Sequence, residues 1–370
     1  MIIVLGSIGG SLLGLSLLLI SLVYPPFSKD LLTEARNTKP SKQFFTRLTF
    51  LMALWAVLAT LVAAPKSLIA WSTVLRLILV IFPVFFAGVC ARRLGPKFLW
   101  WCFILGACLA TLYIFYDYYI IGHQRAELLL GCNAAGTLLL GAVGVFLAAF
   151  YRERSAYRWL YLLASLLAIV GIILTASRAA WIGVIVILAV LFLAAARSRQ
   201  VLIIICLGAL VFSLFVATNN YWVRRFLTIF DLGENSARIN VYRVSISMMA
   251  DNFFGVGFGH FPEAHATYLE EGKKPLAHAH NIFLYFGTEL GPVAFVLSTL
   301  IYCTPVYMCF RISRRKSYFV PVSAALLAVV VRELFDATTS GFALASFLWF
   351  VFGLIFAEYV SLQESVEERN

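Results

Sequence analysis

Apolar residues dominate this chain in long blocks separated by short polar breaks. Most blocks are about 18 to 25 residues long, enough for a helix to cross a ~30 Å hydrocarbon core. Strands of a membrane barrel would alternate apolar and polar positions, and these blocks do not. The pattern therefore predicts an all-α, polytopic transmembrane bundle of about 11–12 spans. The eleven predicted spans are 1–24, 46–64, 68–91, 98–121, 128–150, 159–176, 179–196, 201–218, 281–310, 318–335 and 341–362.

One connection is far longer than the others. It runs over 219–280 and separates eight predicted spans in 1–218 from three in 281–362, with a short tail at 363–370. A long connection in a compact protein is usually functional. Within it the pattern predicts a helix over 236–250, with Ser236 as its N-cap.

Composition agrees with a membrane protein. Hydrophobic residues make up 62% of the chain and charged residues 13%, whereas soluble domains carry roughly 25% charge. The net charge of +11 would suggest a nucleic-acid partner in a soluble protein. Here the charge is explained by Lys and Arg that gather in cytoplasmic loops, so no nucleic-acid partner is predicted.

The distribution of basic residues predicts the topology. Seventeen Lys and Arg residues lie in the loops after the first, third, fifth, seventh and ninth spans, against three in the short loops on the other side (Lys66, Arg125, Arg178). Because basic loops stay in the cytoplasm, the amino terminus and the 219–280 loop are predicted to lie outside and the tail inside.

Sequence motifs typical of ATP hydrolysis and of metal binding are not found in this chain. The chain has no phosphate-binding loop with its lysine, which argues against ATP hydrolysis. Its seven cysteines fall in apolar blocks without a C-x-x-C pair, and no His, Cys or acidic constellation is typical of a metal site. The sequence therefore predicts neither a metal nor another cofactor.

Three residues on the predicted outer side stand out. Arg178 could be an ordinary interfacial arginine, Arg238 an incidental surface charge, and His280 a structural polar residue at the start of a span. Together they suggest more. Two guanidinium groups can bind a diphosphate through bidentate hydrogen bonds, and an imidazole can accept a proton from a sugar hydroxyl.

Four segments of the chain resemble a known family. "TASRAAW", "NSARINVYRVSI", "FFGVGFGHF" and above all "AHAHNIFLYFGTELG" are similar to the O-antigen ligases and O-antigen polymerases. These are polytopic glycosyltransferases of the GT-C type that face the periplasm. The similarity covers about residues 125–291, and the H-N-x-x-L element is its most specific part. Family ligases commonly have twelve spans with both ends inside, whereas this pattern shows eleven.

The resemblance implies roles for individual residues. Arg178 and Arg238 would hold the undecaprenyl diphosphate, and His280 would be the general base. The neighbouring His278 leaves open which histidine of the pair is the base, and Asn281 completes the H-N element. Further candidates are Arg125, for the diphosphate or donor sugar, and Tyr242, for stacking on sugar or isoprenoid.

Other polar residues are assigned structural roles. Arg76 lies in mid-span and is expected to face the protein interior, paired with Asp117 or Glu127. Arg332, Glu333 and Asp336 are close enough in sequence to pair with one another. His260 and His265 are interpreted as ordinary loop residues.

The implied activity is transfer of a glycan from undecaprenyl diphosphate to lipid A-core oligosaccharide, with inversion and without a metal. The protein would then be a multi-pass protein of the bacterial inner membrane with a periplasmic active site, and membrane lipid would surround it. A polymerase that joins lipid-linked repeat units shares this chemistry and remains an alternative. A transporter of lipid-linked glycan is a weaker alternative, because paired broken helices and several midplane charges are not evident. A peptidoglycan polymerase is a further alternative, but it would need a well-placed loop aspartate, and the sequence shows none.

Overall fold

The computed structural model describes residues 40–81, 83–128, 131–195, 199–217, 220–229, 231–269 and 274–367. In these ranges the chain is helical and without strands, which confirms the all-α prediction. The chain divides into two compact units. Unit 1 comprises the described parts of 1–93, 236–305 and 333–370, and unit 2 comprises those of 94–235 and 306–332. The first predicted span, 1–24, lies outside the described residues.

Five helical segments of the described chain are long and apolar enough to cross a membrane. This agrees with the predicted polytopic membrane protein. The five are Phe44–Ala63, Lys97–Ile121, Cys132–Arg152, Pro292–Ser313 and Ala343–Ser365. Shorter apolar helices occur at Leu68–Ile81, Arg158–Leu174, Arg178–Ala194 and Ile205–Leu214.

Unit 1 is built around α3 (Pro40–Ala63), α4 (Leu68–Ile81) and α17 (Phe342–Glu367), which pack against one another. The Phe45 ring of α3 contacts the rings of Phe352 and Phe356 on α17. The predicted span 68–91 is divided in the structure, because α5 (Pro83–Leu94) begins at a proline that has no N–H to continue the preceding helix.

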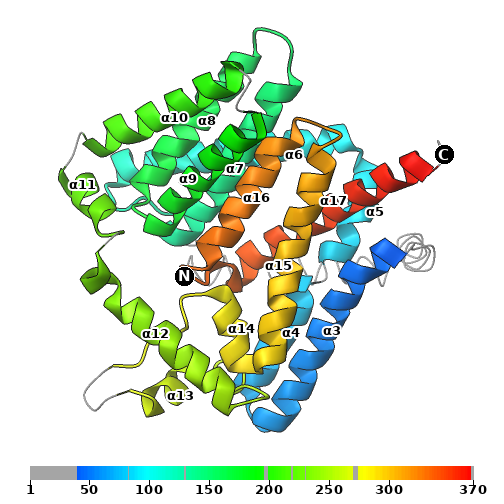
Figure 1. Cartoon of the computed structure of the whole chain (residues 1–370), viewed down its shortest axis with the longest axis vertical. Coiled ribbons are helices and arrows are strands. Elements are labelled where there is room, and N and C mark those ends of the chain that lie inside the picture. The colour runs from blue at the N-terminus through cyan, green and yellow to red at the C-terminus, as the bar shows by residue number, and fades with distance from the viewer. Residues whose placement is uncertain are drawn as a thin grey trace. The chain divides into compact units, whose positions relative to one another are not determined.

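Unit 2 is an array of apolar helices (Figure 1). It contains α6 (Pro96–Tyr116) with a π-helical turn at Asp117–Ile121, α7 (Cys132–Arg152), α8 (Arg158–Leu174), α9 (Arg178–Ala195) and α10 (Arg199–Ala217). It also holds α11 (Asn220–Leu227) and most of α16 (Phe319–Glu333). Most of α7 is buried, and α6, α8 and α9 pack on it, so α7 forms the core of this unit.

The described part of the long connection contains three helices, α11, α12 (Leu232–Asp251) and α13 (Phe261–Thr267). The predicted N-cap at Ser236 is wrong: α12 begins at Leu232, because the Asp231 carboxylate accepts a hydrogen bond from the Gly233 amide (2.8 Å). The helix buries Val241, Val244 and Met248 at helical spacing, in a small core shared with Phe261 and Leu284.

The predicted span 281–310 is not one helix. Residues Ile282–Leu290 form α14, residues Pro292–Ser313 form α15, and the chain breaks at Gly291 between them. Gly291 has φ 85° and ψ 173°, a conformation almost restricted to glycine. A Cβ atom there would overlap the carbonyl group of Phe253. The Trp55 indole donates to the neighbouring Leu290 carbonyl (2.7 Å), which ties the end of α14 to α3.

We expect Gly291→Ala to destabilise the protein strongly. The backbone conformation alone costs about 1–3 kcal/mol for a residue with a Cβ atom, and the overlap with Phe253 adds to this cost. Gly141→Ala is the control, because Gly141 lies in α7 with open space around its would-be Cβ atom. Thermal unfolding in detergent should show a lower midpoint for the first variant only. An unchanged midpoint for Gly291→Ala would contradict this account of the helix break.

Candidate functional site

An aspartate brings the two histidines of the "HAHN" segment together. His280 Nδ1 lies 3.3 Å from Asp336 Oδ1, and His278 Nε2 lies 3.6 Å from the same oxygen. The two imidazole rings are 4.3 Å apart between centroids. The Asp336 side chain is only 8% exposed, whereas those of His278 and His280 are 36% and 27% exposed. The carboxylate is therefore covered by imidazoles that a substrate can still contact.

The backbone at His280 is strained, and it directly precedes the N-cap of a helix. His280 has φ 51°, in the left-handed region that a residue with a Cβ atom adopts at a cost of roughly 1–2 kcal/mol. The next residue, Asn281, is the N-cap of α14, and its side-chain oxygen accepts from the amides of Phe283 (2.9 Å) and Leu284 (3.1 Å). Asn281 therefore has a structural role in ending the turn that presents His280.

The phenol of Tyr242 holds this turn from the side of α12. Its single O–H group faces two carbonyl acceptors, that of Leu334 at 2.8 Å and that of His280 at 3.1 Å. Burial raises the pKa of Tyr242, the positive charge of Arg238 lowers it, and the negative charge of Asp336 raises it. The net effect is a raised pKa, so the phenol keeps its proton. Arg238 and His280 thus both lie near the same tyrosine.

Three arginines surround the turn between α8 and α9 in unit 2. Arg178 is the first residue of α9 and donates to the Thr228 carbonyl (2.9 Å). The Nε atoms of Arg125 and Arg225 each lie 3.4 Å from a carbonyl oxygen of the turn, those of Thr175 and Ala176 respectively. Positive charge therefore gathers at the amino-terminal end of a helix, where the helix dipole also favours anions.

The same turn contains the second left-handed residue of the described chain outside glycine. Ala176 has φ 51°, and it directly precedes Ser177 and Arg178 of the "TASR" segment. Backbone strain of this kind persists where the surroundings enforce it, and it often accompanies functional sites. The two segments that the sequence singled out are thus the two that carry such strain.

The predicted site residues therefore fall into two groups. Arg178 and Arg125 lie together in unit 2, and Arg238, Tyr242, His278 and His280 lie together in unit 1. A meeting of Arg178 with Arg238 and His280 stays a prediction, as does the stacking of Tyr242 on a substrate.

Arg76 differs from its predicted environment. It was expected to face the interior, but its side chain is exposed on α4, and its charge acts on the Tyr285 hydroxyl of α14. Of its suggested partners, Asp117 binds His123 (3.0 Å) and the amide of Glu127 (2.8 Å). Pairing of Arg76 with Asp117 or Glu127 stays a prediction.

Sequence reasoning missed two residues of these groups, Asp336 and Arg225. Asp336 was assigned to a local pairing with Arg332 and Glu333, but it lies past the end of α16 and meets the histidines. Glu333 accepts hydrogen bonds from Thr338 and Thr339, and the pairing of Arg332 with these two carboxylates stays a prediction. The sequence did contain a signal for Asp336. An acidic side chain in an apolar membrane segment is unfavourable in free energy and usually has a function. Arg225 had no such signal, because it lies in a polar connection.

The histidines and Asp336 also form a group that could hold a cation. One ligand atom from each of His278, His280 and Asp336 lies within 4.8 Å of the others. The sequence did not predict such a cluster, because Asp336 is 56 residues away from His280 along the chain. The same geometry also suits a carboxylate that orients an imidazole for proton transfer, which needs no metal.

Comparison with known proteins supports the resemblance. Residues 163–299 match a family model described as O-Antigen ligase. This range includes Arg178, Arg238, Tyr242 and His280, whereas Arg125 and Asp336 lie outside it. The match supports a glycosyltransferase of the O-antigen ligase or polymerase type, without separating the two. No curated protein gives a significant match to the chain.

We expect Tyr242→Phe to loosen the turn at His280. The substitution removes the hydroxyl group and its contacts with the two carbonyl groups. One such hydrogen bond contributes about 1 kcal/mol to stability. Hydrogen exchange should become faster in 278–281 and 334–337. Tyr268→Phe is the matched control, because its hydroxyl binds the Asp251 carboxylate at an exposed position. Unchanged exchange in both segments of Tyr242→Phe would show that the phenol does not hold them.

Proposed function

We propose that this protein is an O-antigen ligase. It transfers a glycan from undecaprenyl diphosphate to the lipid A-core oligosaccharide, with inversion at the anomeric carbon and without a metal. The observation that carries the proposal is the pairing of His280 with Asp336 inside a helical membrane protein whose residues 163–299 match the O-antigen ligase model. A positioned imidazole is what deprotonation of a sugar hydroxyl requires.

His280 acts as the general base. Its Nδ1 atom faces Asp336, so Nε2 is the nitrogen that takes the proton of the acceptor hydroxyl. Asp336 holds the ring in this tautomer and stabilises the imidazolium that forms. His280 is favoured over His278, because the 3.6 Å separation of His278 from Asp336 exceeds hydrogen-bond length. Base catalysis of this kind contributes roughly 10²–10⁴-fold.

The chemical step is an in-line displacement. The acceptor oxygen forms a bond to the anomeric carbon while the bond from that carbon to the diphosphate oxygen breaks. The diphosphate leaves with the electron pair, still attached to its undecaprenyl chain. Arg178 and Arg238 neutralise its charge, at about 3 kcal/mol for each well-placed donor. The contacts of Arg125 and Arg225 with the α8–α9 turn support a wider cationic surface there.

The proposed location follows from the charge distribution. The excess of basic residues in the opposite loops supports an outer-side location of the α8–α9 turn and the 219–280 connection at the bacterial inner membrane. The donor glycan and the lipid A-core are then reached from the periplasm, while the lipid parts of both substrates stay in the bilayer.

Complementation of a ligase-null Gram-negative strain tests the assigned residues. Wild-type protein should restore lipopolysaccharide that carries O-antigen. Arg178→Ala, Arg238→Ala and His280→Ala should each lower it by about 10²-fold or more, while the protein still accumulates. Arg315→Ala is the control, because Arg315 is exposed and lies on the predicted cytoplasmic side. Full activity of all three site variants would end the proposal.

A purified reaction separates ligase from polymerase. Labelled lipid-linked glycan and lipid A-core should give a core-linked product, whereas a polymerase would give only lengthened lipid-linked chains. We expect EDTA to leave the rate unchanged, because an imidazole and guanidinium groups supply the base and the charge. Loss of activity with EDTA, restored by a divalent cation, would instead point to a cation held by His278, His280 and Asp336.

A further inference from the structure

The glycine-rich segment "GVGFGHF" of unit 1 is not used by the proposed chemistry. Its backbone lies unusually close to the connection between α3 and α4. A Cβ atom on Gly257 would lie 2.7 Å from Ala64 Cβ, and one on Gly259 would lie 2.6 Å from Ile69 Cγ2. Both glycines also have positive φ, 92° and 79°. The glycines therefore let this segment pack directly on the α3–α4 turn.

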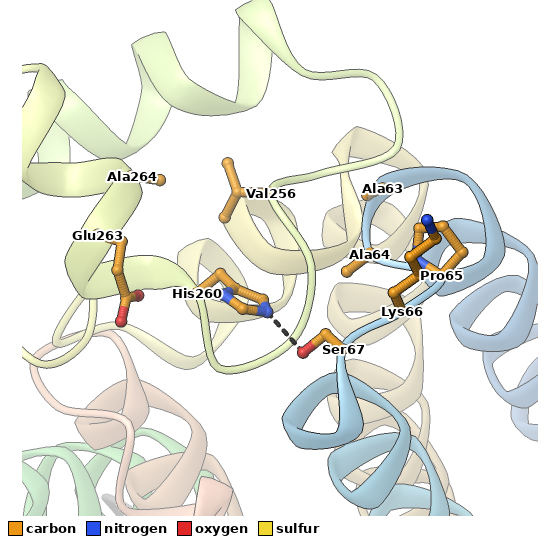
Figure 2. Close-up of a pocket in the computed structure, with 9 residues that line it drawn as sticks. All are labelled: Ala63, Ala64, Pro65, Lys66, Ser67, Val256, His260, Glu263 and Ala264. Atoms are coloured by element: carbon orange, nitrogen blue, oxygen red, sulfur yellow. Dashed lines mark hydrogen bonds between the residues drawn. The ribbon is translucent and has the colours of Figure 1, made fainter.

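A pocket of about 440 Å³ lies where these two segments meet. Its size falls within the ~300–1,000 Å³ of small-molecule sites. One wall is the turn Ala63–Ser67, and the other comes from residues 256–264 (Figure 2). The polar side chains of the lining are Lys66, Ser67, His260 and Glu263. His260, interpreted from the sequence as an ordinary loop residue, is thus part of a pocket.

The pocket offers both donors and acceptors of hydrogen bonds. His260 Nε2 lies 2.7 Å from Ser67 Oγ, and that oxygen accepts from the Ala70 amide (3.2 Å). In the tautomer in which Ser67 donates to Nε2, the proton of His260 sits on Nδ1 and can be donated to a ligand. Within the described part of the chain, the Glu263 carboxylate accepts no hydrogen bond, so its oxygens can take up ligand hydroxyl groups.

These groups suit a carbohydrate better than a strongly charged ligand. They are also incomplete as the catalytic groups of a hydrolase. Lys66 and Glu263 carry opposite charges, so the lining does not select one sign. The Ser67–His260 pair has the spacing of a nucleophile and its base. However, no described carboxylate pairs with His260 to complete a triad. A carboxylate acceptor together with imidazole and ammonium donors suits the neighbouring hydroxyl groups of a sugar.

Hydrogen bonds join one wall of the pocket to α14, the helix that follows His280. The amides of Val256 and Gly257 donate to the carbonyls of Thr288 and Glu289 (3.0 Å each), at the carboxyl-terminal end of that helix. His280 lies just before its amino-terminal end. Nine helical residues span about 13 Å. The pocket and His280 thus lie toward opposite ends of one short helix of unit 1.

We propose that this pocket is a glycan subsite, in which Glu263 and His260, the latter held by Ser67, bind a sugar residue of one substrate away from the bond that reacts. The assignment to a substrate of transfer rests on the proposed function. The sugar belongs either to the core oligosaccharide of the acceptor or to the glycan of the donor, since both present the same hydroxyl groups.

Kinetics of the purified protein in lipid nanodiscs test the subsite. Glu263→Gln and His260→Ala should raise the KM for one substrate about tenfold, the effect of losing a hydrogen bond to a ligand, with kcat nearly unchanged. A higher KM for lipid A-core identifies the acceptor glycan, and a higher KM for the lipid-linked glycan identifies the donor. Glu153→Gln, in a loop of unit 2, is the matched control.

A binding measurement keeps this test independent of transfer. Core oligosaccharide and repeat-unit oligosaccharide, both released from their lipids, are titrated onto the protein and followed by saturation-transfer NMR. Binding of either one that is lost in Glu263→Gln supports the subsite even if no transfer occurs, in which case only the proposed function fails. Absence of binding together with unchanged KM values in both variants would overturn the subsite.

Discussion

The close approach of the chain at Phe253 to Gly291 determines where α14 ends. Only a residue without a Cβ atom allows the Phe253 carbonyl so near the helix end, and the Trp55 indole then covers the Leu290 carbonyl. Because α14 is short and fixed at this end, the position of its first residues is defined. Those residues follow directly on His280. A backbone contact without any catalytic group thus decides where the imidazole lies.

The other end of α14 combines strain with compensating contacts. The left-handed conformation of His280 is unfavourable by itself, but three neighbours favour it. Asn281 satisfies two amides of the first helical turn, Tyr242 binds the His280 carbonyl, and Asp336 meets the ring. Each contact comes from a different part of the chain. The result is an imidazole whose ring orientation is fixed by contacts within the protein, which is the arrangement that the proposed role of His280 as a base requires.

The α8–α9 turn of unit 2 likewise combines a strained residue with side-chain contacts, here those of arginines. A left-handed alanine breaks the helix, Arg178 starts the next one, and Arg125 and Arg225 bind the carbonyls of the turn. Guanidinium groups that are already ordered by such contacts lose less entropy when they bind an anion.

Hydrophobic blocks and the spacing of short motifs were enough to predict the helical membrane class, and the "TASR" and "HAHN" segments pointed to Arg178 and His280. These features are local, because a helix needs only its own residues to satisfy its backbone in lipid. The helix break at Gly291, the role of Asp336 and the pocket at His260 could not be predicted in this way. Each depends on residues far apart in the sequence that lie close together only after packing. Asp336 looked like one member of a local charge cluster until folding placed it beside imidazoles 56 residues away, and no local pattern encodes such a distance.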